Sequence, residues 1–595
     1  MCGIIGCVGR GDETLQTLVE SLGKLEYRGY DSAGVAMAGD RIELRKRAGE
    51  LDALRAAVPE TLPGTVGIGH TRWSTHGPPT DENAHPHVDC TGNVAVVHNG
   101  IIENYQPLRD ELEAAGHTFE SETDTEVVPH LVEDGIADGL DPEAAFRSAV
   151  ARLEGSYALA MVVAGSEAIL AARNDSPLVL GLADDATYLA SDVPAFREHT
   201  DRVVYLEDGQ FARVDRDGWV VTDADGDRID VEIRTVEWDA EDTGKSGYDH
   251  FMLKEIHEQP RALRQCLQGR VDELAGRVSL SELGELDPAR VHLVAAGTSY
   301  HAAIYGAQLL QQSGIPAQAF YAHEYALSPP PIEDALVVGV SQSGETADTL
   351  GAIREASRRG AETLALTNTV GSTMARECNR ALFIRSGPEI GVAATKTFAG
   401  QQTALNLLTI AASPPSDARD AIAALRDLPA NVQTVLDESN AEAVAEAYGG
   451  SDAYFFIGRG LNYPVALEGA LKTKEITYEH AEGFAAGELK HGPLALVTGD
   501  TPVFALVTGD GEAATKTIGS IKEVEARGAP VVAITDGQSE AGRYADHVLR
   551  VPETHPRAAA IVANVQLQLV AYHVANRLGR SIDKPRNLAK SVTVE

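Results

Sequence analysis

Short apolar runs separated by polar turns recur through the first 235 residues of the chain. Several have the length of strands, and the segments between them repeat apolar residues at helical spacing. Strand-like runs are Ile4–Ile5, Val94–Val97, Ala158–Val163, Ala168–Leu170, Leu178–Leu182 and Val203–Leu206, and helical segments are Glu13–Leu25, Gln106–Ala115 and Glu143–Leu153. The pattern predicts one mixed, strand-rich domain over residues 2–235.

From about residue 286 the pattern changes to regular alternation of strands and helices. Predicted strands are Val291–Ala296, Ala335–Val340, Ala361–Thr367 and Ala381–Ile384, then Ala453–Ile457, Pro502–Val507, Pro530–Thr535 and Val548–Val551. Predicted helices are Ser299–Ser313, Glu345–Arg359, Gln401–Ala412, Pro464–Tyr478, Glu512–Arg527 and Arg557–Leu578. This alternation predicts parallel-sheet α/β domains, and its return after residue 447 predicts an internal duplication.

We therefore expect two α/β domains, at residues 286–425 and 447–585. Residues 236–285 are expected to form a linker and a leading helix, because the charged, Gly-containing stretch Asp239–Tyr248 precedes the helical pattern of Phe251–Arg261. Residues 586–595 form a tail without a helix or strand pattern.

The composition narrows the class of protein. No apolar run approaches the ~18 residues of a membrane span, and the N-terminus has no signal-peptide pattern. The five scattered cysteines include no CxxC pair, which argues against a disulfide framework or structural zinc and favours a reducing cytoplasm. The net charge of -38 leaves no basic face for nucleic acid. Its spread along the chain suggests adaptation to high salt, although an ordinary solvated surface is the alternative.

The first candidate for chemistry is Cys2. Removal of Met1 would make it the N-terminal residue, with a thiol and an α-amine on one carbon. An amine with a pKa of ~7.7–8.0 acts as general base toward the adjacent thiol, so no separate catalytic histidine is needed. The alternative is an ordinary buried cysteine at the start of a strand.

Dense polar patches elsewhere in the first domain fit a nucleophile that attacks an amide. Asn99 and the Gly100 N–H are candidates for an oxyanion hole, although Asn-Gly is also a common turn. Arg72 offers a bidentate fork for a substrate carboxylate, and Asp124 suits a substrate ammonium group. The spacing of His85-Pro86-His87 is not convincing for zinc.

These patches resemble the glutaminase domain of the class II, N-terminal nucleophile amidotransferases. The segments that carry the resemblance are Glu26–Ser32, Thr71–Gly77 and His98–Asn104. It implies a four-layer αββα fold with Cys2 as nucleophile, Asn99 and Gly100 as oxyanion hole, and Arg28, Arg72, Trp73, Thr75, His76, His85 and Asp124 as glutamine-binding residues. Trp73 would also match the gate of an internal ammonia channel.

In the first α/β copy a hydroxyl-rich loop, Ser341–Thr346, ends a strand and opens a helix. Such a loop cradles phosphate with backbone N–H groups and the helix dipole, and without a P-loop lysine it suits a sugar phosphate. The alternative is that the loop is a simple helix N-cap. Further hydroxyls, those of Thr298 and Ser299 at the end of another strand, favour the phosphate site over this alternative. The second copy carries Asp510 in the matching loop, so one sugar site per chain is expected.

One helix of the second copy carries Glu468, Lys472 and Glu475 at spacings that place them on one face. A surface ladder of ion pairs would explain such a triplet and would contribute only ~0.3–0.5 kcal/mol per pair. The helix is rich in alanine, and lysine is scarce in this chain, which favours a functional site.

The α/β halves resemble paired sugar isomerase (SIS) domains, on the segments Ser341–Thr346, Glu468–Lys472, Glu488–Pro493 and Pro585–Glu595. The resemblance implies a Schiff base at Lys590, a proton shuttle between C1 and C2 at Glu475, and ring opening by His491 of the neighbouring subunit. It implies sugar-phosphate contacts from Thr298, Ser299, Ser341, Gln342, Ser343, Thr346, Val392, Lys472 and Ala589. Two positions depart from the family pattern: many relatives have Ser in place of Ala394, and some have Cys in place of Ala296.

Together the two resemblances indicate an amidotransferase family that uses L-glutamine and fructose 6-phosphate, without a metal or organic cofactor, as a homodimer. One rival keeps the glutaminase but aminates a phosphoribosyl donor, which needs a pyrophosphate-binding acidic loop. A second rival, a deglycase-like protein that cleaves fructosyl-amino acids, would lack Cys2 and the groups around it. A sugar-phosphate-binding regulator would have lost Cys2, Glu475 or Lys590, and all three are present.

Overall fold

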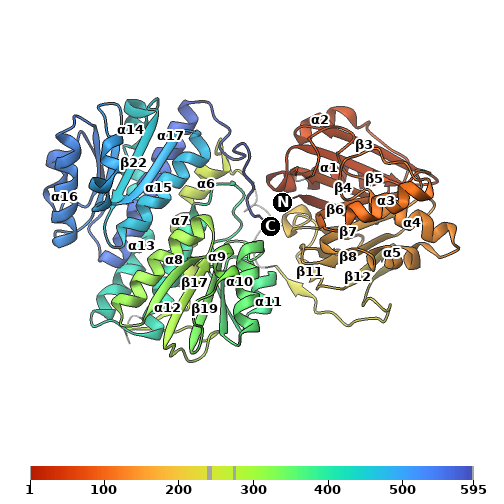
Figure 1. Ribbon diagram of the computed structural model, residues 1–595, viewed down its shortest axis with the longest axis horizontal. Coiled ribbons are helices and arrows are strands. Elements are labelled where there is room, and N and C mark those ends of the chain that lie inside the picture. Colours follow the sequence, from red (N-terminus) through yellow and green to blue (C-terminus); the bar gives the residue numbers. More distant parts are fainter. Residues whose placement is uncertain (1, 75, 237–243, 273–275, 593–595) are drawn as a thin grey trace. The chain divides into compact units, whose positions relative to one another are not determined.

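The computed structural model describes residues 2–74, 76–236, 244–272 and 276–592 (Figure 1). Its contacts divide the chain into two compact units. The first unit consists of Met1–Thr243 with Ala589–Glu595, and the second of Gly244–Leu588. We describe each unit by itself.

The first unit has four layers, with two antiparallel sheets enclosed by helices. The eight-stranded sheet has the order β14 (Arg234–Thr235), β11 (Arg202–Tyr205), β9 (Val179–Leu182), β10 (Thr187–Ala190), β1 (Gly3–Val8), β4 (Val66–Arg72), β2 (Ser32–Ala38), β3 (Ile42–Ala48). The six-stranded sheet has the order β13 (Gly218–Thr222), β12 (Phe211–Asp215), β8 (Ile169–Asn174), β7 (Gly155–Val163), β6 (Val94–Ile102), β5 (His87–Val88). Helices α1 (Thr14–Leu25) and α2 (Leu51–Ala57) cover the first sheet, and α3 (Tyr105–Ala115), α4 (Val127–Ala137) and α5 (Pro142–Val150) cover the second. The αββα expectation is confirmed.

Alternation along the central strands explains the layers. In β1, Ile4 and Val8 join the core between the two sheets, whereas Ile5 and Cys7 join the core under α1 and α2. Successive side chains of a strand point to opposite faces, so a strand buried on both faces is apolar at nearly every position. This arrangement places Cys2 directly before a fully buried strand.

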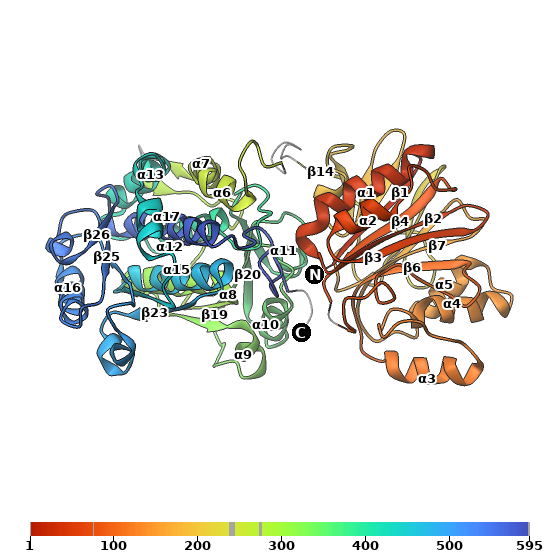
Figure 2. The same cartoon turned by 90° about the horizontal axis from the view of Figure 1, so that it is seen from above.

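The second unit contains two five-stranded parallel sheets with the same topology (Figure 2). The first has the order β18 (Ala317–Tyr321), β17 (Arg290–Ala295), β19 (Ala335–Ser341), β20 (Glu362–Thr367), β21 (Arg380–Phe383). The second has the order β23 (His480–Ala485), β22 (Ala453–Gly458), β24 (Val503–Val507), β25 (Val531–Thr535), β26 (His547–Arg550). In chain order both sheets are 2-1-3-4-5, which confirms the duplication and places a topological switch point between strands 1 and 3.

The helices of the second unit are α6 (Phe251–His257), α7 (Gln259–Leu267), α8 (Gly297–Gln312), α9 (Ala322–Leu327), α10 (Ala347–Arg358), α11 (Thr373–Glu377), α12 (Lys396–Ala412), α13 (Ala418–Glu438), α14 (Ala441–Tyr448), α15 (Asn462–Thr477), α16 (Glu512–Glu525) and α17 (Pro556–Arg577). Helix α17 is long and apolar enough to cross a membrane by length and composition, but 94% of that stretch is buried inside the protein. It lies in the core that joins both α/β copies.

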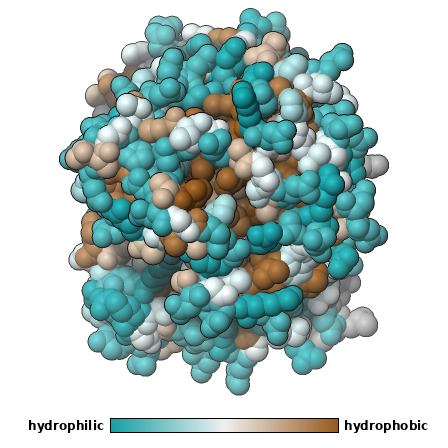
Figure 3. All heavy atoms as spheres, turned by 90° about the vertical axis from the view of Figure 1, so that its right-hand side faces the viewer, coloured by the Kyte–Doolittle hydropathy of each residue, from teal (hydrophilic) through white to brown (hydrophobic). Residues whose placement is uncertain are grey.

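The sequence pattern missed one of the two edge strands of each parallel sheet, β18 and β23, whereas the other edge strands, β21 and β26, were predicted. β18 and β23 are largely half-exposed. They therefore lack the continuous apolar run that identified the central strands. On the surface shown in Figure 3, hydrophilic side chains predominate and apolar ones form small patches.

Candidate active sites

Cys2 lies at the entry to β1, in contact with the end of β4. Its Sγ accepts a hydrogen bond from the Trp73 backbone N–H at 3.3 Å and lies 3.6 Å from the Trp73 carbonyl oxygen. Gly29 allows this approach, since a Cβ there would lie 2.6–2.7 Å from the backbone of Arg72 and Trp73. The side chain is partly exposed, as a nucleophile requires.

Asn99 is oriented toward Cys2 by a buried histidine. His70 Nε2 lies 3.0 Å from the His98 carbonyl oxygen and 3.1 Å from Asn99 Oδ1. Burial lowers the pKa of His70 to about 3, so the ring is neutral, and two acceptors at Nε2 place its proton there. The Asn99 Nδ2 group is then the end that faces Cys2, donating to its carbonyl oxygen at 2.8 Å. Gly100 follows with a φ of 134°, where a Cβ would collide with the Ser156 carbonyl.

Arg28 and Arg72 hold the backbone around the nucleophile. Arg28 donates to the Cys2 carbonyl oxygen at 3.2 Å and pairs with Asp192 at 2.8 Å. Arg72 donates to the carbonyl oxygens of His76, Gly77 and Pro78. Burial lowers the pKa of Arg72, and the neighbouring Cys2, Asp31 and Asp124 oppose that shift.

Asp124 lies on a loop that histidines hold against the six-stranded sheet. Its Oδ2 accepts a hydrogen bond from the Ile102 N–H at 2.8 Å and lies 3.9 Å from His98 Nδ1. Thr125 hydrogen-bonds His98 at 2.8 Å, and Thr123 hydrogen-bonds His87 at 3.0 Å. The loop is thus fixed on both sides of the carboxylate.

The other glutamine-binding candidates are His85, His76 and Thr75. His85 is buried and its ring stacks on His70 at 4.2 Å, with burial lowering its pKa well below the usual value. His76 packs edge-on against Tyr105 at 5.6 Å. Thr75 lies outside the described residues. The assignments of all these residues to glutamine stay predictions.

In the second unit, the predicted sugar-phosphate loops meet at the switch point of the first sheet. Thr298 and Ser299 follow β17, and Ser341–Thr346 follows β19, the two strands that flank the switch. Ligands of open α/β sheets bind at this carboxyl edge. Ser341 Oγ and Thr346 Oγ1 lie 3.0 Å apart, and Ser299 Oγ accepts from Gln401 at 2.8 Å.

The N-termini of α8 and α10 both point at this switch point. Thr346 is the N-cap residue of α10 and Ala296 that of α8, but neither side chain makes a capping hydrogen bond, so the loop is not explained as a simple N-cap. The matching loop of the second copy differs, because the Gly509 N–H is bound by the carboxylate of Asp536 at 2.7 Å. Helix α16 of the second copy also has no side-chain cap, so the two loops differ in the Asp536 carboxylate, whose negative charge disfavours an anion beside the second loop.

The Glu468, Lys472 and Glu475 triplet of α15 is not a surface ladder. Lys472 and Glu468 are buried, and Lys472 Nζ lies 3.4 Å from Glu468, in closer contact with Glu475, and 3.0 Å from Thr298 Oγ1. Burial lowers the pKa of Lys472, but Glu475 and Glu468 raise it by more, so its pKa lies above the usual value. A lysine held charged is a binding group rather than a neutral amine nucleophile.

The remaining sugar-site candidates are placed as follows. Val392 donates its N–H to the Asp583 carbonyl oxygen at 3.1 Å, which ties the loop after β21 to the segment that precedes the tail. His491 is exposed at the end of a short 3₁₀ turn, Glu488–His491. Ala589 and Lys590 belong by their contacts to the first unit, and their part in the sugar site stays a prediction.

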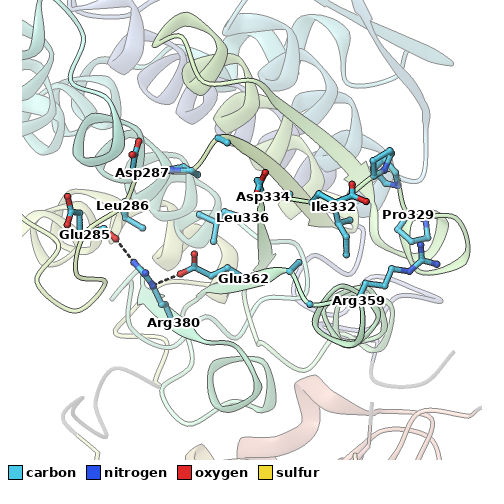
Figure 4. A pocket seen from close by; sticks show the side chains of 18 residues that line it. Glu285, Leu286, Asp287, Pro329, Ile332, Asp334, Leu336, Arg359, Glu362 and Arg380 are labelled. Atoms are coloured by element: carbon cyan, nitrogen blue, oxygen red, sulfur yellow. Dashed lines mark hydrogen bonds and ion pairs between the residues drawn. The ribbon is translucent and has the colours of Figure 1, made fainter.

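A hollow on the first α/β copy lies at the opposite end of the sheet (Figure 4). Ala335, Glu362 and Arg380, which begin β19, β20 and β21, line it, and Arg380 pairs there with Glu362 at 2.7 Å. Parallel sheets place ligands at the carboxyl ends of their strands, so this amino-end hollow is not the substrate site.

Sequence reasoning missed three residues that position the sites. His70 orients Asn99, His301 Nδ1 lies 2.7 Å from Glu468, and Gln401 supports Ser299. His301 follows Thr298 by three residues, so helical spacing offered a signal for it. Gln401 and His70 gave no such signal, because their partners are distant in the sequence.

Comparison with known proteins agrees with the two kinds of domain. Residues 70–198 match the family model of the glutamine amidotransferase domain, and residues 286–411 and 450–576 match that of the SIS domain. Curated relatives named glutamine--fructose-6-phosphate aminotransferase [isomerizing] from Halobacterium salinarum and Symbiobacterium thermophilum are 54% and 49% identical, with both chains fully covered. A solved C-terminal domain of glucosamine-fructose-6-phosphate aminotransferase from Francisella tularensis is 34% identical, with a TM-score of 0.53, and covers 57% of this chain and 100% of its own. The chain therefore belongs to the family of isomerizing glutamine--fructose-6-phosphate aminotransferases.

Proposed function

We propose that this chain transfers the amide nitrogen of L-glutamine to fructose 6-phosphate and isomerises the product to glucosamine 6-phosphate. The observation that carries the proposal is that two different sites occur in one chain. In the second unit, the buried side chains of Lys472 and Glu468 contact Thr298 at the hydroxyl-lined switch point. In the first unit, the side chain of Asn99 contacts Cys2. Relatives of full length bear the name of this reaction.

In the glutaminase half, the Cys2 thiol gives its proton to the α-amine and the sulfur attacks the glutamine amide carbon. Asn99 Nδ2 and the Gly100 N–H stabilise the tetrahedral oxyanion, a contribution of roughly 3–4 kcal/mol per donor. The C–N bond breaks and ammonia leaves with the transferred proton. Water then hydrolyses the thioester, which releases glutamate and restores the thiol.

In the isomerase half, the amides at the start of α8 and α10, with the hydroxyls of Ser341 and Thr346, bind the sugar phosphate. The open-chain ketose condenses with the Lys590 amine and loses water, and ammonia displaces the lysine to leave a C2 imine. Glu475 removes a proton from C1 and a proton is added at C2, while the O1 hydroxyl proton passes to the nitrogen, so that the C2 imine becomes a 2-amino aldose. The water consumed at the thioester equals the water lost at C2.

We also propose that the protein is a cytoplasmic homodimer in which His491 of one protomer opens the ring in the other. The exposure of His491 in a single chain agrees with a role at a neighbouring subunit. A phosphoribosyl amidotransferase is disfavoured, because the switch loop Ser341–Thr346 carries three hydroxyls and a single carboxylate, Glu345, where a pyrophosphate and metal site needs an acidic loop.

The test is product analysis with amide-¹⁵N glutamine and fructose 6-phosphate in the presence of excess unlabelled ammonium. We expect glucosamine 6-phosphate that carries ¹⁵N in the wild type. Cys2→Ala should make no glutamate but should still interconvert the sugar phosphates. Failure of the wild type to form the amino sugar would refute the proposal, and unlabelled product would refute direct transfer of the amide nitrogen.

A further inference from the structure

Four potential metal ligands converge on the outer side of the six-stranded sheet, away from Cys2 in the sequence. Cys90 lies in the turn after β5, His117 follows the C-terminus of α3, and His130 and Glu133 lie one turn apart on α4. The ligand atoms of this Cys-His-His-Glu cluster all lie within 4.8 Å of one another.

Five of the six separations between the ligand atoms match the edges of a tetrahedron, and the sixth, between Cys90 and Glu133, lies within 4.8 Å. Cys90 Sγ lies 3.5 Å from Nδ1 of His117 and 3.5 Å from Nδ1 of His130, and the two Nδ1 atoms are 3.2 Å apart. Glu133 Oε2 lies 3.2 Å from His117 Nδ1 and 3.4 Å from His130 Nδ1. Zinc bond lengths of ~2.0–2.3 Å give tetrahedral edges of about 3.3–3.6 Å, so these five separations fit one ion that is bound by all four atoms.

The surroundings also suit a metal site. The side chain of His130 is 1% exposed, that of His117 9% and that of Glu133 17%, while Cys90 is exposed and leaves the cluster accessible. The two imidazole planes lie at 64° to each other. His117 directs its other nitrogen, Nε2, to Asp134 Oδ1 at 2.9 Å, the outer carboxylate contact typical of metal-bound histidines.

We propose that Cys90, His117, His130 and Glu133 bind one Zn²⁺ ion. A thiolate, two imidazoles and a carboxylate in tetrahedral array favour zinc over calcium or magnesium, which prefer oxygen ligands and more of them. Binding releases the Cys90 thiol proton as the S–Zn bond forms, and the histidines bind through Nδ1 as neutral rings. Four protein ligands leave no open position, so the ion is structural and performs no chemistry.

The ion would fasten the loop that carries Asp124. His117 and His130 lie at the two ends of the segment between α3 and α4. Within this segment, the Glu126 carboxylate already accepts hydrogen bonds from the N–H groups of Glu120 and Ser121. Cys90 links the same segment to the end of β5 and also donates its N–H to Glu133 at 3.1 Å. Closing this loop with a metal restricts the unfolded chain and stabilises the first unit.

The test uses the full-length protein, purified without chelator or affinity metal. Elemental analysis should find equimolar zinc, and Co²⁺ substitution should give the intense visible bands of a tetrahedral site with a thiolate-to-cobalt charge-transfer band. Cys90→Ser should lose the charge-transfer band, and Cys90→Ser with Glu133→Gln should lose the zinc. Asp134→Asn should weaken zinc binding about 10–100-fold.

Matched controls separate this site from other thiols and carboxylates. Cys2→Ala and Glu113→Gln, which alters an exposed carboxylate on α3 paired with Arg109, should keep the full zinc content and the cobalt spectrum. A wild type that takes up neither ion overturns the proposal and leaves a hydrogen-bonded cluster. Equal metal content in Cys90→Ser with Glu133→Gln and in wild type also overturns it, whereas loss of the cobalt spectrum in Cys2→Ala assigns the metal to the nucleophile instead.

Discussion

Replacement of Lys472 by Met tests whether the buried charge cluster of α15 is an integral part of the second unit. Lys472 and Glu468 are 1% and 0% exposed, and their charges lie 3.4 Å apart. At an effective dielectric constant of ~20 their attraction is about 5 kcal/mol, and loss of one partner from a buried pair costs ~3–5 kcal/mol. Methionine has a similar length, so the main change is two carboxylates left without their cation.

The expected effect is a large loss of thermal stability confined to the second unit. The entropy of unfolding for a unit of the length of Gly244–Leu588 is about 0.7 kcal/mol/K, so 3–5 kcal/mol lowers its Tm by roughly 4–7 °C. The folded pKa of Lys472 is raised, so its contribution is present at neutral pH and is lost only as the pH rises through that raised pKa. The difference from wild type should therefore persist through neutral pH and shrink in alkaline solution.

Scanning calorimetry of the full chain is the measurement, with glutamine hydrolysis as the check that the first unit is folded. Lys490→Met is the matched control, because Lys490 and Glu523 form a pair of 3.3 Å that is 51% and 36% exposed. Such a pair contributes at most ~1 kcal/mol, or about 1 °C here. Equal melting temperatures for the two variants would show that the buried cluster does not stabilise the fold, and the reasoning from burial would be wrong.

Two further predictions concern the tail and the surface. Lys590→Arg keeps the charge but cannot form a Schiff base, so it should abolish amination and isomerisation while glutamine hydrolysis continues. Borohydride reduction with fructose 6-phosphate should label Lys590 in the wild type. A label on Lys472 or Lys490 would contradict the assignment. With a net charge of -38, the protein should melt at a lower temperature in millimolar than in molar salt, because the Debye length grows from ~3 Å at 1 M to ~30 Å at 0.01 M. An unchanged or higher melting temperature in low salt would exclude the salt-adaptation interpretation.

The elements that were predictable from the sequence are those whose apolar residues form a continuous run or repeat at regular spacing. Central strands such as β19 and β24 are continuous apolar runs, and both occupy the third position of their sheets, as the predicted duplication requires. The edge strands β18 and β23 carry half-exposed residues, so no run of apolar positions marks them. Their place is decided by pairing with β17 and β22, which is a tertiary interaction.

In the candidate sites, too, local spacing was predictable from the sequence and tertiary contacts were not. Glu468 and Lys472 share a helix face by spacing alone, but their burial depends on packing that no local pattern reveals. The expectation that the cysteines bind no structural metal rested on the absence of a CxxC pair. The geometry brings Cys90 together with His117 and His130, ligands 27 and 40 positions away in the sequence, and the strand-to-helix packing that joins them leaves no spacing motif.

The two α/β copies contribute different groups to the predicted sugar site. In the second copy the Asp536 carboxylate already occupies the Gly509 amide, so a phosphate at that switch point would meet negative charge. The same copy nevertheless supplies α15, whose Lys472 and Glu468 contact Thr298 at the switch point of the first copy. The second copy thus brings charged side chains to the edge of the first sheet where helices α8 and α10 begin. Neither copy alone contains both sets of groups within the described residues, so a single α/β half is expected to bind or react poorly.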